Sequence, residues 1–459
     1  MRLCELPADC GPKGVCVGFM CRTGADQALV EVLHPVAVLP AVVSPNAAAV
    51  DREVRRLTQR LGQDLGWSGF YAVKTEADQA SFSPSWLKEG ASPAEVRRVS
   101  WQALGIERLV MTAVGKRPDG SFEVRIRGVD IERWSVIDLP EGKVTIAPGA
   151  SETDIGAISN GWVNALVGYD TGIPASLGSR IVGSTEVKQG VKEIAFVGSD
   201  GGGWTQVTSN GSLNLQAAWG PGGKLGWMSY QTGNADWWVD ECAAAIGPKK
   251  GPSCAKPFST RPGLNAGGAW SPDGRYLALS VAETGDSEII LIDGKDGEEE
   301  ARLTDHPALD TSPAWSPDGK RLAFVSDRVA QNPQIFVLSL EGGPLEQVTH
   351  EGYNAGPEWS PNGQSLLFVR QSGNDFMVMR YDFGTNDVRR LTNGKGSAES
   401  PTFSPDGRYI AYTLTIDKVS RLWVMNADGE NPRAVGGEAA EKAFSSPAWE
   451  RRFVVKPGK

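Results

Sequence analysis

Histidine is scarce in this sequence: only His34, His306 and His350 occur among 459 residues. A metal-dependent lyase needs several converging histidines, and a hydrolase needs a histidine beside a nucleophile motif. The motifs G-x-S-x-G, H-E-x-x-H, the P-loop and a strand-to-helix G-x-G-x-x-G are also missing. We therefore predict no catalytic residue, no cofactor and no metal site. His306 lies in a polar loop and is interpreted as a partner contact or a solvent-exposed residue.

Long apolar runs are absent as well. No stretch reaches about 18 apolar residues, so no membrane-spanning helix is predicted. The net charge of -9 disfavours binding to nucleic acid and to anionic membranes. A chain of 459 residues exceeds the size of a single hydrophobic core, so at least two domains are expected in what we predict to be a monomer.

The few cysteines fall into two groups. Cys4, Cys10, Cys16 and Cys21 lie within a segment, residues 1–28, that is too short to bury a core. Two disulfides are the favoured interpretation, with a structural zinc site as the alternative, although CxxC pairs are missing. Cys242 and Cys254 are expected to close a loop as a third bridge.

Disulfides indicate an oxidising compartment. The first residues lack the apolar core of a secretory signal, so we place the export signal upstream of the numbered start as a hypothesis.

An aromatic residue recurs at a regular interval through the C-terminal two-thirds of the chain. The recurring anchors are Trp219, Trp270, Trp315, Trp359, Phe403 and Trp449, spaced 51, 45, 44, 44 and 46 residues apart. In three copies the anchor precedes Ser-Pro-Asp-Gly, and in a fourth Ser-Pro-Asn-Gly. Both are turn sequences, and an alternating apolar strand follows them. Three further strand signals follow, giving four strands per repeat, which is typical of a propeller blade. We interpret the anchors as core packing between blades.

The two ends of the repeat region are incomplete in a complementary way. Residues 180–208 begin with a blade strand that has no anchor before it, whereas Trp449 has no full blade after it. Pairing these two ends in one composite blade would remove both open edges. The sequence therefore predicts a six-bladed β-propeller, closed by its N- and C-terminal strands, over residues 180–459.

A different pattern precedes the propeller. Residues 36–43, 70–74, 107–114 and 121–129 read as strands, and residues 51–65, 92–104 and 154–167 as helices. This order predicts a two-layer α/β domain over residues 30–168, followed by a linker at 169–179.

The repeats and three N-terminal stretches together resemble the TolB family. The three stretches are residues 101–110 (WQALGIERLV), 117–122 (RPDGSF) and 171–181 (TGIPASLGSRI), and the similarity covers roughly residues 36–449. The WSPDG repeats alone also occur in prolyl oligopeptidase propellers, so the N-terminal stretches make the resemblance specific.

The resemblance implies a non-catalytic periplasmic protein of the Tol-Pal system, with roles in outer-membrane integrity, cell division and protein import. Its partner would be a peptidoglycan-associated lipoprotein (Pal), bound by loops just before the anchor strands. The matching positions are Leu215, Gln216, Asn265, Gly267, Asp310, Thr311, Ser312, Asn354, Ala355, Glu399, Ser400, Ser445 and Ser446. The family also binds TolA through its extreme N-terminus, where this sequence has the cysteine cluster instead.

The sequence is also compatible with two other functions. One is a propeller of the prolyl oligopeptidase or oligosaccharide lyase type, and the other is a binder of a different envelope ligand.

Overall fold

The computed structural model describes residues 14–17, 20–23, 33–74, 101–102, 104–243, 254–283 and 285–451. The chain divides into two compact units, Met1–Gly178 and Ser179–Lys459, which are described separately. No helix within the described ranges combines the length and the apolar character needed to cross a membrane.

The first unit is built on a sheet with the strand order β5-β3-β6-β7-β8, to which β4 adds through β6 and β9 through β7. Its strands are β3 (His34–Val38), β4 (Val42–Val43), β5 (Tyr71–Lys74), β6 (Arg108–Lys116), β7 (Phe122–Asp130), β8 (Ser135–Ile137) and β9 (Lys143–Ile146). The single strand predicted over residues 36–43 is divided, because Pro40 has no N–H for the ladder and interrupts the pairing. A separate hairpin joins β1 (Gly14–Val17) to β2 (Met20–Thr23).

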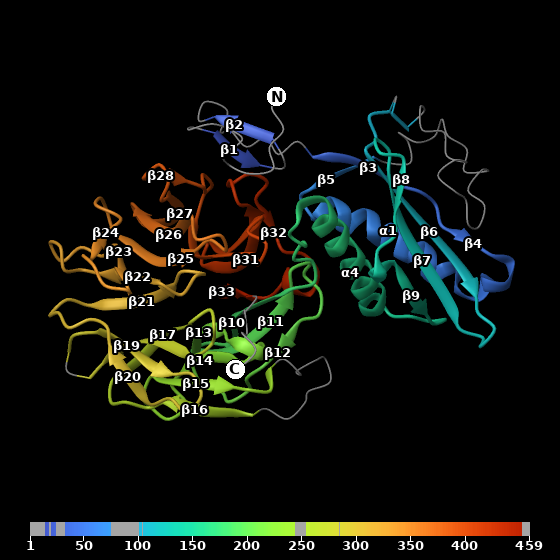
Figure 1. Cartoon of the computed structure of the whole chain (residues 1–459). Coiled ribbons are helices and arrows are strands. Elements are labelled where there is room, and N and C mark those ends of the chain that lie inside the picture. The colour runs from blue at the N-terminus through green and yellow to red at the C-terminus, as the bar shows by residue number, and fades with distance from the viewer. Residues whose placement is uncertain are drawn as a thin grey trace. The chain divides into compact units, whose positions relative to one another are not determined.

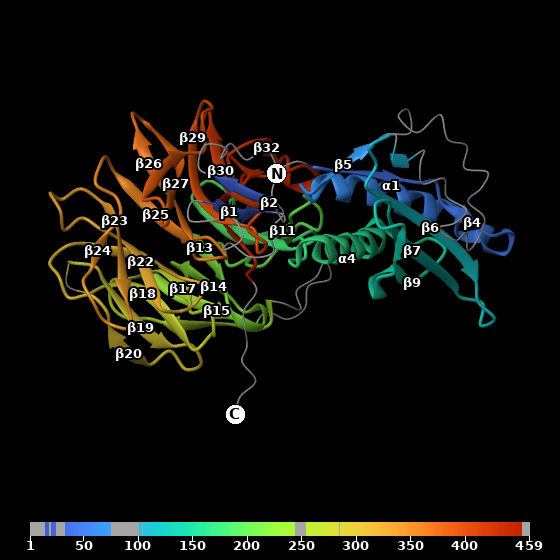
Figure 2. The same ribbon diagram turned by 45° about the horizontal axis from the view of Figure 1, so that its top comes forward.

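Two long helices lie side by side against this sheet (Figures 1 and 2). Helix α1 (Asp51–Trp67) buries Leu57, Leu61 and Leu65, as its helical spacing predicts. Helix α4 (Glu152–Thr171) starts with a Ser151–Asp154 capping box and ends at Gly172 in the left-handed conformation, so it continues into the predicted linker. Of the helix predicted over residues 92–104, most falls outside the described residues; Trp101 and Gln102 are helical. Short 3-10 helices cover Pro45–Val50, Pro140–Gly142, Pro221–Gly223 and Gly437–Ala439.

Two glycines of the first unit differ sharply in the space around them. A Cβ at Gly142 would lie 2.1 Å from the backbone oxygen of Ile126, whereas a Cβ at Gly161 would meet nothing within 4 Å. We expect Gly142→Ala to lower the free energy of unfolding by about 3 kcal/mol through overpacking. Gly161→Ala, in the middle of α4, should raise it by about 0.5–1 kcal/mol. Urea denaturation of the full chain would measure both, and equal midpoints for the two variants would contradict the packing described here.

Six four-stranded antiparallel sheets form the second unit and surround a common centre (Figure 1). Blade 1 contains β10 (Arg180–Lys188), β11 (Val191–Gly198), β12 (Thr205–Gln206) and β33 (Ser445–Trp449). Blade 2 contains β13 (Asn214–Trp219), β14 (Leu225–Ser229), β15 (Asp236–Asp240) and β16 (Ala255–Ser259). Blade 3 contains β17 (Leu264–Trp270), β18 (Tyr276–Ala282), β19 (Glu288–Asp293) and β20 (Glu299–Arg302). Blade 4 contains β21 (Asp310–Trp315), β22 (Arg321–Ser326), β23 (Gln334–Ser339) and β24 (Glu346–Gln347). Blade 5 contains β25 (Asn354–Trp359), β26 (Ser365–Ser372), β27 (Asp375–Asp382) and β28 (Asp387–Arg390). Blade 6 contains β29 (Ser397–Phe403), β30 (Tyr409–Ile416), β31 (Val419–Asn426) and β32 (Arg433–Ala434).

Blade 1 is the composite blade that closes the ring, as predicted. The C-terminal strand β33 pairs with β10, with Trp449 opposite Ile181 and Ala448 opposite Val182. Arg180 then binds the carboxylate of Glu450 through its guanidinium at 2.7 Å, and its carbonyl accepts the Glu450 N–H at 2.8 Å. Both ends of the ring therefore protect each other's open strand edge.

Each inner strand ends at its anchor aromatic, and in blades 3 to 6 the Ser-Pro turn that follows repeats the same hydrogen bonds. In blade 4, Ser316 Oγ donates to the Asp318 carboxylate at 2.5 Å and accepts from the Arg321 N–H at 2.9 Å. Burial acts to raise the pKa of Asp318, but the hydrogen bonds from Ser316 and from the Lys320 N–H hold that pKa below its ordinary value. Gly319 takes the positive φ that the turn needs, 72°. The Ser-Pro-Asp-Gly sequences therefore serve as turns.

Cys242 and Cys254 form a disulfide that closes a loop between β15 and β16, with a Cα–Cα distance of 5.5 Å. Cys4 and Cys10 lie outside the described residues. Cys16 and Cys21 are backbone partners in the β1–β2 hairpin, but their side chains are also outside the described part, so the two N-terminal bridges stay a prediction.

Candidate functional site

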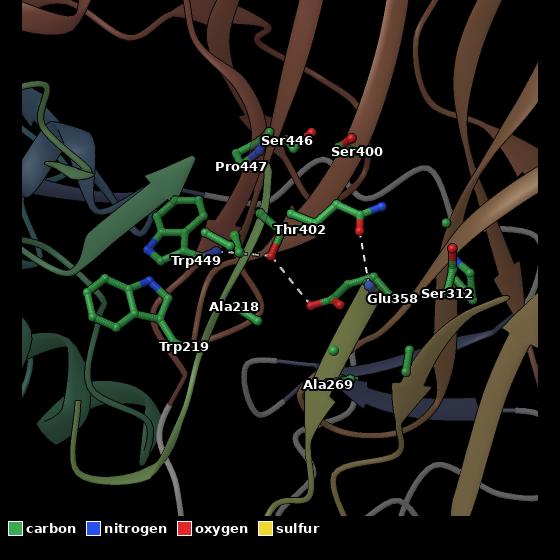
Figure 3. Close-up of a pocket in the computed structure, with 18 of the residues that line it drawn as sticks. Ala218, Trp219, Ala269, Ser312, Glu358, Ser400, Thr402, Ser446, Pro447 and Trp449 are labelled. Atoms are coloured by element: carbon green, nitrogen blue, oxygen red, sulfur yellow. Dashed lines mark hydrogen bonds between the residues drawn. The ribbon is translucent and has the colours of Figure 1, made fainter. Parts of the chain in front are cut away.

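The inner strands of all six blades line one central channel, which encloses a cavity of about 260 Å³ (Figure 3). These strands are β13, β17, β21, β25, β29 and β33, each contributing residues just before its anchor aromatic. The anchors Trp219, Trp270 and Trp449 line the cavity as well. Because strands alternate in direction within a blade, the loops that precede the inner strands open on the same face as the hairpins joining second to third strands. We call this the loop face, and the opposite side, with the Ser-Pro turns, the turn face.

A ring of left-handed residues surrounds the channel mouth on the loop face. Each stands three residues before an anchor and has φ between 51° and 65°. The six are Gln216, Gly267, Ser312, Gly356, Ser400 and Ser446. The ladder to the second strand shifts register around this position in every blade, as a β-bulge requires. Four of the six are not glycine, so the mouth holds backbone strain where a side chain faces the channel.

The bulge directs backbone N–H groups towards the neighbouring blade. Ser312 N–H donates to Ser280 Oγ at 3.1 Å, and Ser446 N–H donates to Thr413 Oγ1 at 3.2 Å. Gly267 N–H donates to the side-chain oxygen of Gln216, its counterpart in the previous blade, at 3.0 Å. These bonds join adjacent blades around the mouth and hold its polar side chains in fixed positions.

The predicted contact residues fall into two groups. Ten have at least partly exposed positions in or beside the ring, and all of them belong to inner strands. These are Leu215, Gln216, Gly267, Thr311, Ser312, Ala355, Glu399, Ser400, Ser445 and Ser446. The structure therefore brings together residues that are up to 230 positions apart in the sequence, from 216 to 446. Five of the ten line the cavity itself: Gln216, Gly267, Ser312, Ser400 and Ser446.

The other three strand positions, Asn265, Asp310 and Asn354, are 0% exposed. Asn265 donates to the carbonyls of Ala235 and Arg261 at 3.1 and 2.7 Å. Asp310 accepts a charge-assisted hydrogen bond from Arg328 at 2.7 Å. Each of these residues stands five positions before its anchor, where its buried hydrogen bonds hold the start of the inner strand in place. They therefore stabilise the mouth and do not face a ligand.

Asn354 belongs to a buried network that recurs between blades. Its Nδ2 donates to Gln334 Oε1 at 2.9 Å, and the same oxygen accepts from Thr349 Oγ1 at 2.7 Å. In blade 1 and the strand after it, Glu193, Thr208 and Asn214 make the equivalent contacts. A fully hydrogen-bonded network of this kind specifies one register for each loop.

His306 lies in the loop before β21. Its N–H donates to buried Glu288 at 2.7 Å, and its Nδ1 accepts from the Ala308 N–H at 3.1 Å. The side chain is half-buried and braces its own loop on the loop face. Of the other histidines, His34 contacts Glu107 at 2.5 Å in the first unit, and His350 borders a separate cavity between β24 and β28.

Exposed apolar side chains of the propeller concentrate on the loop face. Among the described residues of the second unit, all the large exposed hydrophobics but one are in loops or strand ends of this face. They are Val187, Tyr230, Leu309, Val329, Tyr353, Ile416 and Val419. The exception is Val388 in β28. Exposed apolar side chains that gather on one face mark it as a candidate protein-binding surface.

Sequence reasoning missed the charged residues inside the channel. Glu358 and Arg451 contact each other at 2.5 Å, and Thr402 Oγ1 lies 3.4 Å from the Glu358 carboxylate. The signal that could have found Glu358 is its repeat position, one before the anchor, where most other blades have alanine.

One group of potential metal ligands occurs within the described ranges: Asp240, Cys242 and Cys254. Because the two cysteines are joined as a disulfide, they offer no thiolate to a metal ion. Asp240 instead accepts the Cys242 N–H at 2.8 Å and stabilises the start of the loop.

Comparison with known proteins supports the same architecture. Residues 170–452 match the family model described as the TolB beta propeller domain. The Tol-Pal system protein TolB of Helicobacter hepaticus is 30% identical over 165 residues, 34% of this chain and 39% of that protein. The TolB of Desulfosudis oleivorans is 32% identical over 233 residues, 50% of this chain and 48% of that protein. The matched part of the chain thus spans less than half the length of these relatives.

A solved structure shares the fold over nearly the whole chain. The crystal structure of TolB from Acinetobacter baumannii superposes with a TM-score of 0.72 at 23% identity, covering 92% of this chain and 97% of that one.

Proposed function

Because the chain belongs to the TolB family, we propose that it is a non-catalytic periplasmic component of a Tol-Pal-like envelope system. Its propeller binds a Pal-like peptidoglycan-associated lipoprotein at the channel mouth. Through this contact it supports outer-membrane integrity and cell division. The extreme N-terminus has the cysteine cluster in place of the family's TolA-binding segment, so a TolA-like partner is not part of this proposal.

The single observation that carries this proposal is the composition of the loop face. Seven exposed apolar side chains surround a ring of small and polar residues whose backbone is fixed by bonds between blades. The exposed apolar side chains offer contact area to a protein partner, and the ordered polar mouth on the same face offers hydrogen-bonding groups. Because the mouth is ordered by its own bonds, it is largely preorganised and ordering costs on binding are small.

The proposal is tested by binding of the soluble Pal domain from the same organism, measured by isothermal titration calorimetry with the full chain. Thr311→Arg and Glu399→Arg place bulky cations at the mouth and should weaken binding about tenfold or more. Lys320→Ala is the matched control, since this exposed residue pairs with Glu341 on the turn face.

Wild-type protein that fails to bind Pal would overturn the proposed partner. If the two mouth variants bind as tightly as wild type while the Lys320→Ala variant does not, the assignment of the face would be wrong.

A further inference from the structure

One position in the channel departs from the pattern of the repeats. The residue just before each anchor is small in five blades and lines the cavity. These five are Ala218, Ala269, Ala314, Thr402 and Ala448. Blade 5 has Glu358 instead, which is 17% exposed. Removing a carboxylate from water costs free energy, so we expect a cation beside Glu358 to compensate its charge.

The chain supplies that cation from its own C-terminal end. Arg451, two residues beyond the closing anchor, donates from Nη2 to Glu358 Oε2 at 2.5 Å. Thr402 of blade 6 links the two blades that carry this pair. Its Oγ1 donates to the Glu358 carboxylate at 3.4 Å and accepts the Trp449 N–H at 3.2 Å (Figure 3). The pair therefore joins blade 5, through blade 6, to the composite blade.

The surroundings of the pair suit an organic cation. A second cavity of about 310 Å³ continues from the first towards the turn face, and Glu358 and Arg451 line both. Its walls are the anchors of blades 3 to 6 together with the prolines of their Ser-Pro turns. Apolar walls strengthen the attraction between a carboxylate and a cation, compared with an open surface. Since the Arg451 side chain is still 38% exposed, solvent competes for it and the contact can be exchanged.

We propose that Glu358 forms a binding site for a guanidinium or ammonium group inside the channel, and that Arg451 is its built-in, competing occupant. The external occupant is a basic side chain of the protein that binds the loop face, an identification that rests on the proposed function. Glu358 stands two residues below the left-handed ring, a depth of about 7 Å, which a lysine or arginine side chain can span. Partner binding and release of Arg451 are thereby coupled.

The chemistry of the site is tested without any partner, using L-argininamide as the probe. Arg451→Ala vacates the site, so this variant should bind argininamide about tenfold more tightly than wild type in a calorimetric titration. Adding Glu358→Gln to Arg451→Ala should abolish the gain, and Arg451→Lys should behave as wild type because the occupant is kept. Glutamate at the same concentration tests for a general salt effect and should not bind.

Equal affinity for argininamide in wild type, Arg451→Ala and the double variant would overturn the site. Arg451→Gln repeats the measurement with a bulkier neutral side chain in case the alanine variant is poorly folded, which circular dichroism would reveal. Pal binding is then compared between wild type and Arg451→Ala, with tighter binding expected in the variant. Unchanged Pal affinity, with argininamide binding intact, would overturn the coupling to the partner while leaving the Pal proposal itself untouched.

Discussion

Trp449→Ala is expected to lower the free energy of unfolding of the propeller by about 3–5 kcal/mol, the cost of emptying a large buried site. Trp449 is 2% exposed, and its indole N–H donates to Ser179 Oγ at 2.7 Å. It also holds β33 in register against β10, opposite Ile181. Loss of this anchor weakens the one seam of the ring that has no covalent connection, so the destabilisation should be concentrated at β10 and β33.

Denaturant unfolding followed by circular dichroism would give the stability change, and hydrogen exchange of the β10 amides would locate it. Trp449→Phe is the matched control, because the repeat already uses Phe403 at the equivalent position. That variant keeps the ring but loses the bond to Ser179, and should cost about 1 kcal/mol. Fast exchange spread evenly over all blades, instead of concentrated in β10, would argue against a local seam.

Removal of Arg328 is expected to have the second largest effect, about 3–5 kcal/mol for Arg328→Met. Asp310 is completely buried, and Arg328 is the cation that contacts its carboxylate, at 2.7 Å. Without the guanidinium, a negative charge is left uncompensated at the start of β21. The Arg328 guanidinium also lies over the Phe324 and Phe336 rings, at 5.5 and 5.2 Å from their centroids, so packing is lost as well.

Two comparisons isolate the charge in this prediction. Asp310→Asn combined with Arg328→Met should recover at least about half of the loss, because Asn214, Asn265 and Asn354 stand at the same repeat position. Arg275→Met removes an exposed partner of Asp273, 71% accessible, and should change stability by less than about 0.5 kcal/mol. A double variant less stable than Arg328→Met alone would show that the buried charge is not the cause.

The propeller was predictable from sequence because its signals are repeated. An aromatic anchor followed by Ser-Pro-Asp-Gly recurs, and each repetition reduces the chance of error in the others. The composite blade followed from counting, since Trp449 lacked the strands that residues 180–208 supplied. The first unit has no repetition, so the short strands β8 and β9 and the break at Pro40 escaped prediction.

The side-chain orientations at the channel mouth were harder to predict from the sequence. Asn265, Asp310 and Asn354 precede the anchors in the same way as the exposed positions do. A polar residue at the start of a strand gives no sign in the sequence of whether its side chain turns inward. The bulge left a clue that is visible in retrospect: Pro313, Pro357, Pro401 and Pro447 each follow a left-handed residue. Proline lacks the N–H that a regular ladder needs, so its recurrence there indicates a distorted strand.

The composite blade also dictates an order of assembly. Strand β10 is translated before five complete blades, whereas β33, which covers its edge, is translated after all of them. A nascent chain therefore carries an uncovered strand edge, a template for pairing with other chains, until the last blade strand has been made. We expect the chain to be open to such pairing over that interval, and a circular permutant with β33 moved ahead of β10 would shorten it.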